Sequence, residues 1–118
     1  MQREFRLTKS KDFSSVQREG RSQANRLLIL KVLKNGLSVS RFGFSVGRGV
    51  GTAVTRNTLK RRLRAAVQAI PVSAGWDVVV IARPTAADRS FDELKTGLEQ
   101  LLGRAGLLAT KAKEALEE

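Results

Sequence analysis

The sequence predicts a single domain of mixed α/β (α+β) class, in which helices and strands share one hydrophobic core. Residues 27–33 and 41–47 have the composition or the alternation of strands, and the aliphatic run from Val78 to Ile81 is typical of a fully buried strand. Leucines recur at helical spacing after Ser90. A chain of 118 residues can bury such a core without disulfides or a metal.

The first element is expected to be a short helix from about Lys9 to Arg18. Its N-cap is expected at Thr8 or Ser10, because both hydroxyls can accept a backbone hydrogen bond. Gly20 is expected to end the helix. The chain then enters its first strand region.

Two strand regions follow, each with two distinct faces. The first has one face of Leu28, Leu30 and Val32, and another of Leu27, Ile29, Lys31 and Leu33. The second has one face of Phe42, Phe44 and Val46, and another of Arg41, Gly43 and Ser45. Lys31 marks its own face as less buried, and the small, basic face of the second region could form the floor of a groove. Asn35-Gly36 predicts a short hairpin turn between the two regions.

The strand from Trp76 to Arg83 is expected at the centre of the sheet and is closed by Pro84. Trp76 is expected to pack rather than to stack on a base. The last helix starts at a capping box formed by Ser90 and Glu93. Its apolar stripe belongs to the core and not to a partner zipper, and it contains Leu94, Leu98, Leu101 and Leu102.

Cationic residues dominate the stretch 56–64, which lies in a helical repeat that Thr52 can cap and Pro71 stops. One arc of this helix is apolar and contains Leu59, Leu63, Ala66, Val67 and Ile70. The adjacent arc is basic and contains Arg56, Asn57, Lys60, Arg61 and Arg64. No acidic residue occurs between Glu19 and Asp77, so the basic arc favours RNA phosphate over a merely solvated face.

The glycines at positions 47, 49 and 51 precede this helix. Their free amides and the positive helix end could bind an RNA phosphate, but a mere tight turn explains them equally well. The pattern contains neither the full dinucleotide-binding spacing nor a Walker lysine.

Charge is unevenly distributed along the chain. Residues 1–64 hold 16 of the 22 Lys and Arg residues but only 3 of the 11 Asp and Glu residues. Such segregation indicates a surface for a polyanion, whose affinity should fall steeply with salt. RNA is therefore the expected partner, and neither a membrane nor DNA is expected.

The chain contains no histidine and no cysteine, which removes the commonest general base, thiolate nucleophile and zinc ligands. A carboxylate-based metal nuclease is the remaining enzymatic alternative, but the clustered acids are explained by capping and solvation. We expect no catalytic residue and no metal site in the protein itself. The absence of a signal-like or membrane-spanning apolar run favours a cytoplasmic location.

Taken in order, the motifs of the chain resemble the protein component of bacterial ribonuclease P from Leu7 to about Leu108. The early motifs are Lys11-Asp12-Phe13, Ala24-Asn25-Arg26 and Phe44-Ser45-Val46. The later motifs are the segment 51–57, the basic run Lys60-Arg61-Arg62-Leu63-Arg64, and the strand 77–84. The resemblance implies a two-layer sandwich in the order αβββαβα, with four strands and an unusual left-handed βαβ crossover. A fourth strand fits if the ribbon 21–33 is split into two.

The resemblance also implies a function. In that family the RNA subunit hydrolyses precursor tRNA with bound Mg²⁺ and removes the 5′ leader, while the protein assists substrate recognition and metal affinity. Residues 1–109 would form the RNA-binding domain, and residues 110–118 a charged C-terminal tail. The alternative function is that of a structural RNA-binding protein, such as a ribosomal protein.

Site residues carry over from the family position by position. Contacts with the catalytic RNA are implied for Arg48, Arg56, Asn57, Lys60, Arg61, Arg62 and Arg64. A cleft for the single-stranded leader is implied for Phe13, Gln17, Ile29 and Lys31. Phe13 could stack on a leader base or simply pack in the core.

The sequence departs from the family pattern in three places. Thr58 replaces the second arginine of an Arg-Asn-Arg signature, so that contact would be lost or shifted to Arg61 or Arg62. The segment 47–49 lacks the common serine and two lysines, and Gln17 and Lys31 replace frequent aromatic residues. The cleft is therefore expected to bind its leader more by charge than by stacking.

Overall fold

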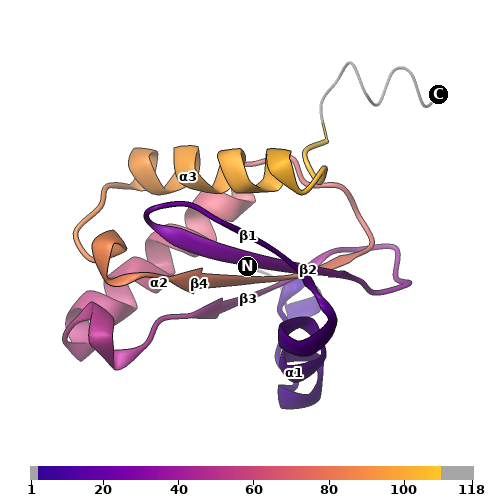
Figure 1. Cartoon of the computed structure of the whole chain (residues 1–118), viewed down its shortest axis with the longest axis horizontal. Helices are drawn as coiled ribbons and strands as arrows, with labels where there is room; N and C mark the ends of the chain where they lie inside the picture. Colours follow the sequence, from indigo (N-terminus) through magenta and orange to yellow (C-terminus); the bar gives the residue numbers. More distant parts are fainter. Residues whose placement is uncertain (1–2, 110–118) are drawn as a thin grey trace.

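The computed structural model describes residues 3–109 and contains seven helices and strands in the predicted order (Figure 1). They are α1 (Ser10–Glu19), β1 (Arg21–Ala24), β2 (Leu28–Lys34), β3 (Arg41–Ser45), α2 (Ala53–Gln68), β4 (Trp76–Ala82) and α3 (Phe91–Arg104). The short 3-10 turns are η1 (Arg3–Phe5), η2 (Arg48–Val50) and η3 (Pro84–Ala86). The predicted α+β class is confirmed, and the predicted tail 110–118 lies outside the described residues.

The four strands form one mixed sheet in the order β1-β2-β4-β3. β4 pairs antiparallel with β2 and parallel with β3, which confirms the predicted central position of the valine-rich strand. Val78, Val79 and Val80 are fully buried because β4 is covered on both faces. α2 makes the connection from β3 to β4, and its left-handed sense stays a prediction from the family resemblance.

The hairpin predicted at Asn35-Gly36 is wrong, because β4 lies between β2 and β3. A turn does form there, and Gly36 adopts a φ of +71°, which favours glycine. The side-chain amide of Asn35 donates to the Val39 carbonyl at 3.1 Å and to Asp77 Oδ1 at 2.9 Å. The dipeptide signals a local turn but carries no information about which strand will pair with β2.

The predicted division of the ribbon 21–33 is confirmed, since β1 and β2 form an antiparallel pair that ends where Ala24 faces Ile29. Asn25 makes this turn: its Oδ1 accepts from the N–H groups of Leu27 and Leu28 at 3.0 and 2.9 Å. Its Nδ2 donates to the Gly97 carbonyl of α3 at 3.1 Å. One side chain therefore both closes the turn and attaches it to a helix.

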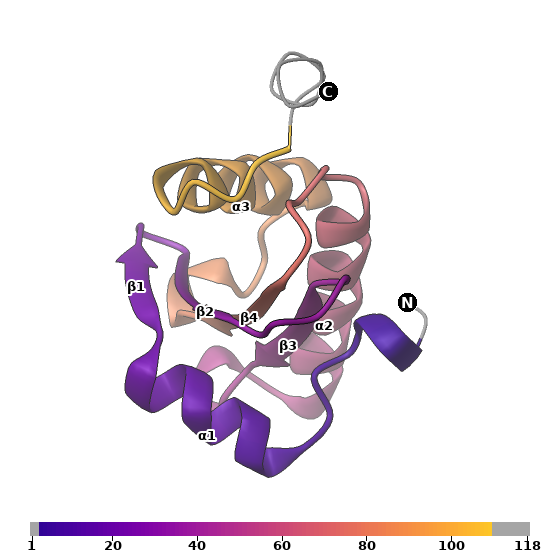
Figure 2. The same ribbon diagram turned by 90° about the vertical axis from the view of Figure 1, so that its right-hand side faces the viewer.

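The main core lies between the sheet and the pair α2 and α3, which cover the same face (Figure 2). The predicted inward face of β2 is buried there and consists of Leu28, Leu30 and Val32. The leucine stripe of α3 is buried as expected, and so are Leu59 and Leu63 of α2. The predicted capping box is present, because the Ser90 hydroxyl accepts from the Glu93 N–H and the Glu93 carboxylate accepts from the Ser90 N–H.

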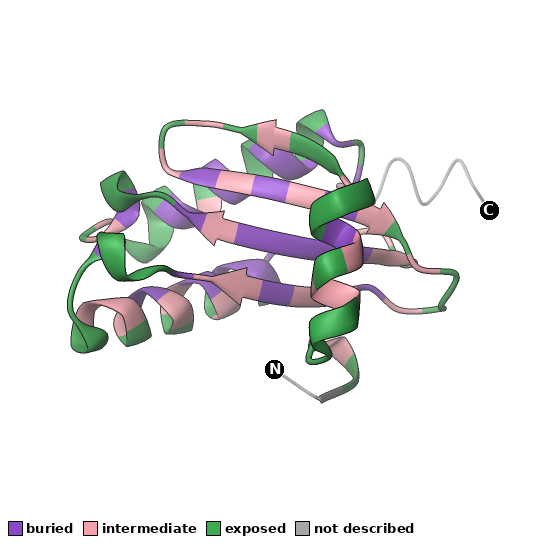
Figure 3. Ribbon diagram, turned by 60° about the horizontal axis from the view of Figure 1, so that its bottom comes forward, coloured by how far each residue is buried: buried purple, intermediate pink, exposed green. Residues whose placement is uncertain are grey.

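On the opposite face, α1 runs across the strands near one end of the sheet and leaves the rest of that face uncovered (Figure 3). Neither Thr8 nor Ser10 caps α1, so that prediction is wrong. Lys9 occupies the N-cap position with extended backbone, without a side-chain cap, and Ser10 is already helical. Gly20 ends the helix as predicted, and its N–H donates to the Val16 carbonyl at 2.8 Å. 

Candidate nucleic-acid interface

The basic helix α2 begins as predicted after a glycine-rich turn. Thr52 is its N-cap, and the Thr52 hydroxyl accepts from the Thr55 N–H at 3.3 Å. Gly51 adopts a φ of +156°, at the border of the region that side chains rarely enter, and the Val50 side chain is buried beneath the turn. The apolar arc of the helix is anchored in the core, so the direction of its basic arc is fixed by packing.

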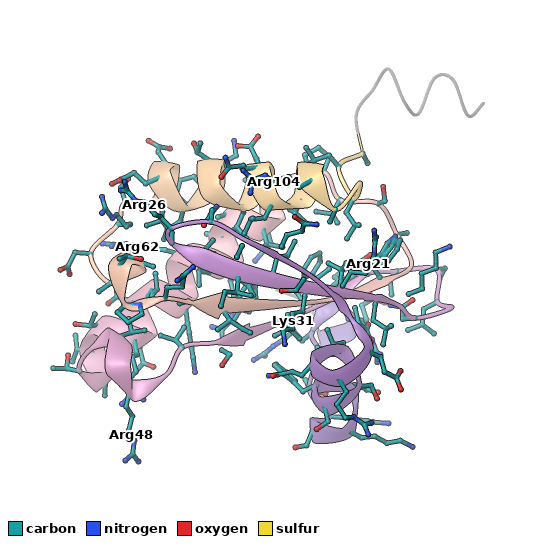
Figure 4. The ribbon with its side chains drawn as sticks, viewed as in Figure 1. Arg21, Arg26, Lys31, Arg48, Arg62 and Arg104 are labelled. Atoms are coloured by element: carbon teal, nitrogen blue, oxygen red, sulfur yellow. The ribbon has the colours of Figure 1, made fainter. Side chains whose placement is uncertain are left out.

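The predicted RNA-subunit residues do not all lie in the same environment. Arg48, Asn57 and Arg61 are exposed, whereas Arg56, Lys60, Arg62 and Arg64 are partly buried. Arg48 extends away from the body of the molecule from the loop before α2 (Figure 4). Within residues 3–109, none of these cations forms an ion pair with a carboxylate. Their charges are therefore available to an anionic partner.

Arg62 differs from the other cations of α2, because its Nη1 donates to the Arg89 carbonyl at 2.9 Å. This contact ties α2 to the segment before α3. Arg61 instead lies beside the departure at position 58, where its Nη2 approaches the Thr58 hydroxyl at 3.4 Å. Of the two arginines, Arg61 is the exposed one beside Thr58, and Arg62 is the one held by a contact within the fold.

The Arg56 side chain is partly enclosed near the start of α2. Its Nε is the one buried side-chain polar atom of the described residues that has no hydrogen-bond partner in the structure. Because this Nε is covered by the protein, a phosphate oxygen can reach the Arg56 guanidinium only at its outer nitrogens. The contact with the catalytic RNA that the family resemblance implies for Arg56 stays a prediction.

The predicted leader cleft lies beside α1 on the sheet face that the other helices leave free. Lys31 Nζ donates to the Gln17 carbonyl at 3.3 Å, so the structure brings these two residues together. The Phe13 ring lies on Gly43, whose strand position is in register with Val79 and, one strand further, with Lys31. The backbones of Gly43, beneath the Phe13 ring, and Lys31 thus lie about 10 Å apart, which is two strand spacings.

Ile29 occupies the part of this face that α1 leaves open. It is half-buried and pairs with Ile81 of β4 on one side and Ala24 of β1 on the other. Ser45 of β3 aligns with Ile81, so the floor is made of apolar and small side chains. The prediction that the Arg41, Gly43 and Ser45 face of β3 lines the groove side is consistent with this arrangement.

A polar network joins α1 to the sheet, and no local sequence pattern predicted it. Arg41 donates from Nη2 and Nε to the Asp77 carboxylate at 2.6 and 2.8 Å, and from Nη1 to Asp12 of α1 at 3.4 Å. The hydrogen bond to Asp77 is the main reason why the pKa of Arg41 lies above its ordinary value. The one signal in the sequence was a lone aspartate, Asp77, directly before the apolar run that starts at Val78.

The described residues contain no group of three or more His, Cys, Asp or Glu side chains placed to hold a metal ion. No helix in the described range is both long and apolar enough to cross a bilayer. The candidate site residues are mainly cationic and amide side chains, which are suited to a polyanion.

Comparison with known proteins shows the family of this chain. The family model described as Ribonuclease P matches residues 1–106. The ribonuclease P protein component of Symbiobacterium thermophilum is 46% identical, over 92% of this chain and 96% of that protein.

Solved structures of the same family share the fold of this chain. A Staphylococcus aureus ribonuclease P protein, described as a mutant with defective mRNA degradation activity, superposes with a TM-score of 0.82. It is 30% identical to this chain and covers 89% of this chain and 91% of its own. The Thermotoga maritima ribonuclease P protein superposes with a TM-score of 0.75 at 34% identity, over 84% of this chain and 96% of its own. The chain therefore belongs to the bacterial ribonuclease P protein family and is a subunit of that tRNA-processing enzyme, not a ribosomal protein.

Proposed function

We propose that this protein binds the RNA subunit of ribonuclease P through α2 and the preceding loop, and holds the 5′ leader of precursor tRNA beside α1. The observation that carries the proposal is the basic arc of α2, which forms no ion pair with the described carboxylates and lies on a helix whose other side is packed in the core. Helix and loop cations of this kind position a phosphate backbone without reading its sequence.

In this proposal the RNA subunit carries the hydrolysis. The protein has no histidine or cysteine, and its described carboxylates are engaged by Arg41, by Arg89 or by a helix cap, or lie scattered. The described residues do not fit a magnesium site. We therefore assign Mg²⁺ to the RNA subunit, and the role that we assign to the protein does not involve the metal. The protein acts by lowering the repulsion between RNA segments and by orienting the leader.

The leader cleft would act by charge and shape. Phe13 presents a partly exposed ring, and the floor beside it is apolar around Ile29 and Ile81. Lys31 places an ammonium group at the α1 side of this floor. A ring and a cation along one strand of RNA give contact that tolerates any sequence, because every base has a π-face and every linkage a charge.

Reconstitution tests the function. The purified protein is combined with a bacterial ribonuclease P RNA at low Mg²⁺, and 5′ leader cleavage of a precursor tRNA is measured with each component omitted in turn. We expect cleavage that requires the RNA and is stimulated by the protein. Absence of stimulation, at concentrations where the protein binds that RNA, would contradict the proposed role.

One arm of this experiment addresses a second activity. Because the superposed Staphylococcus aureus protein is described in connection with mRNA degradation, the protein alone is also incubated with an mRNA fragment. If the protein still cleaves the mRNA fragment after further purification, and a substitution in this chain abolishes the cleavage, hydrolysis belongs to the protein. We expect none, because the chain contains no histidine, the commonest general base, and no cysteine to act as a nucleophile.

A further inference from the structure

A pocket of about 290 Å³ opens at the free edge of β3, between the segment before α1 and the helix α2. Arg6 and Leu7 lie alongside β3 at this edge, where Arg6 bridges to Phe42 and the Leu7 N–H donates to the Phe42 carbonyl at 2.9 Å. The segment then departs towards α1. The pocket begins at the point where this segment no longer lies alongside β3.

Three cations line the pocket: Arg6, Lys60 and Arg64. Lys60 and Arg64 are four residues apart on α2 and therefore share a face of the helix. The lining contains no acidic residue, and no ion pair found between residues 3 and 109 involves these three side chains. Three positive charges around one small cavity repel each other unless an anion enters it.

The edge of the strand adds a hydrogen-bonding group. Backbone groups alternate sides along a strand, so Phe44 directs its peptide group to the same edge as Phe42. Phe42 pairs there with Leu7, but no segment of the described chain pairs with Phe44 on this side. An unpaired N–H at an edge strand, surrounded by cations, is suited to an anionic oxygen.

The position of the pocket identifies the anion. Phe13, a residue of the proposed leader cleft, also lines this pocket, so the cleft continues around the edge of β3 towards α2. We propose that the pocket holds a backbone phosphate of the single-stranded precursor tRNA leader, where the leader leaves the cleft. This inference rests on the proposed function and adds Arg6 to the residues that bind the substrate. It also assigns Lys60 and Arg64, the two α2 cations that line the pocket, to the leader, and leaves the other cations of the basic arc to the RNA subunit.

The test uses the holoenzyme assembled from the protein and ribonuclease P RNA. The dissociation constants for precursor tRNA and for mature tRNA are measured over a range of salt concentrations with Arg6→Ala, Arg6→Lys and Lys95→Ala. Arg6 is exposed and its side chain makes no hydrogen bond within the described chain, so its removal leaves the fold intact. Lys95 lies on α3, which packs on the other face of the sheet, and provides a control with the same loss of charge.

For Arg6→Ala we expect about three- to tenfold weaker binding of the precursor and unchanged binding of mature tRNA. The slope of log affinity against log salt should fall by about one for the precursor. Arg6→Lys should recover most of the affinity, because it keeps the charge, and Lys95→Ala should match the wild type.

Three results would overturn the inference: equal behaviour of Arg6→Ala and Lys95→Ala, a loss of the same size for mature tRNA, or a loss confined to binding of the RNA subunit. Leader cleavage with the wild-type protein distinguishes failure of the pocket assignment from failure of the proposed function. If wild type stimulates leader cleavage while Arg6→Ala binds precursor normally, only the pocket assignment is wrong.

Discussion

The Phe13 ring lies directly on the backbone of Gly43. A Cβ placed on Gly43 would lie 2.3 Å from the Phe13 Cζ, which is closer than a Cβ approaches a non-bonded heavy atom in real proteins. The ring also packs against a small cluster of Leu7, Val16 and Val79, yet it stays partly exposed. The two roles considered for Phe13, core packing and base stacking, are therefore compatible: one side of the ring packs and the rest can meet a base.

Replacing Gly43 tests this contact. Gly43→Ala should lower the free energy of unfolding by about 1–3 kcal/mol, because the added methyl group forces the Phe13 ring out of place. Urea unfolding followed by circular dichroism measures the change. Gly47→Ala is a matched control, since Gly47 has an extended backbone and no atom near its missing Cβ, and it should change stability by less than about 0.5 kcal/mol. Equal effects of the two substitutions would contradict the packing described for Phe13.

The two neighbouring arginines of α2 should differ in what they support. Arg62→Ala should lower the free energy of unfolding by about 0.5–1.5 kcal/mol, because it leaves the Arg89 carbonyl without its donor. Arg61→Ala should leave stability unchanged and weaken binding of the RNA subunit, since Arg61 is exposed beside Thr58. Thermal unfolding and filter binding measure the two quantities. The reverse pattern would show that Arg62 replaces the missing family arginine.

Among the elements, the start of α3 is stabilised by contacts between residues that are close together in the sequence. Its capping box joins Ser90 and Glu93, and Arg89 forms an ion pair with Glu93 at 3.1 Å. The hydrogen bond from the Ser90 N–H is the main reason why the pKa of Glu93 is lowered, followed by the hydrogen bond from Arg89. Its ionised form is thus favoured by the folded helix.

Ser90→Ala should lower the free energy of unfolding by about 1 kcal/mol at neutral pH, because the first turn of α3 loses its cap. The pH dependence has a definite sign. A lowered carboxyl pKa contributes stability that is present above the unfolded-state pKa and is lost as pH falls through the folded-state pKa. The difference between wild type and Glu93→Gln should therefore shrink on acidification. Urea titrations from neutral pH downward would show it, and a difference that grows in acid would contradict the assignment.

Elements with a strong local pattern were predictable from the sequence. α2, α3 and β4 follow from helical spacing, a cap or an uninterrupted aliphatic run. The pairing of strands was not predictable in the same way: the Asn35-Gly36 turn does not reveal that β4, some forty residues later in the chain, inserts between β2 and β3. The contact of Arg41 with Asp12 and Asp77 is equally non-local.

The candidate site was predictable to a similar extent. The basic arc of α2 is a local pattern, and it lies on the outside of the packed helix as expected. The role of Arg6 was missed, because a single arginine before the first helix has no distinguishing neighbour in the sequence. Arg6 stands out only in the folded protein, where it lines one pocket together with Lys60 and Arg64.

At the scale of the whole molecule, the sheet separates two surfaces. α2 packs on one face of the sheet with α3, and α1 crosses the other face (Figures 2 and 3). The basic arc therefore belongs to a helix on one face, and the proposed leader cleft lies on the opposite face. The pocket at the β3 edge is where they meet. The net charge of +11 favours binding of RNA by both surfaces, and the assignment of each surface to a different RNA is the central claim.

The most direct test of this claim measures two affinities for Arg56→Ala and Phe13→Ala: protein for RNA subunit, and holoenzyme for precursor relative to mature tRNA. Arg56→Ala should weaken assembly with the RNA subunit and lower its salt slope by about one, while the precursor preference persists. Phe13→Ala should leave assembly unchanged and reduce the precursor preference by about 1–3 kcal/mol. Unfolding curves confirm that both variants are folded under the assay conditions. If the two variants weaken both affinities alike, or change neither, the assignment of α2 to the catalytic RNA and of the α1 cleft to the leader is wrong.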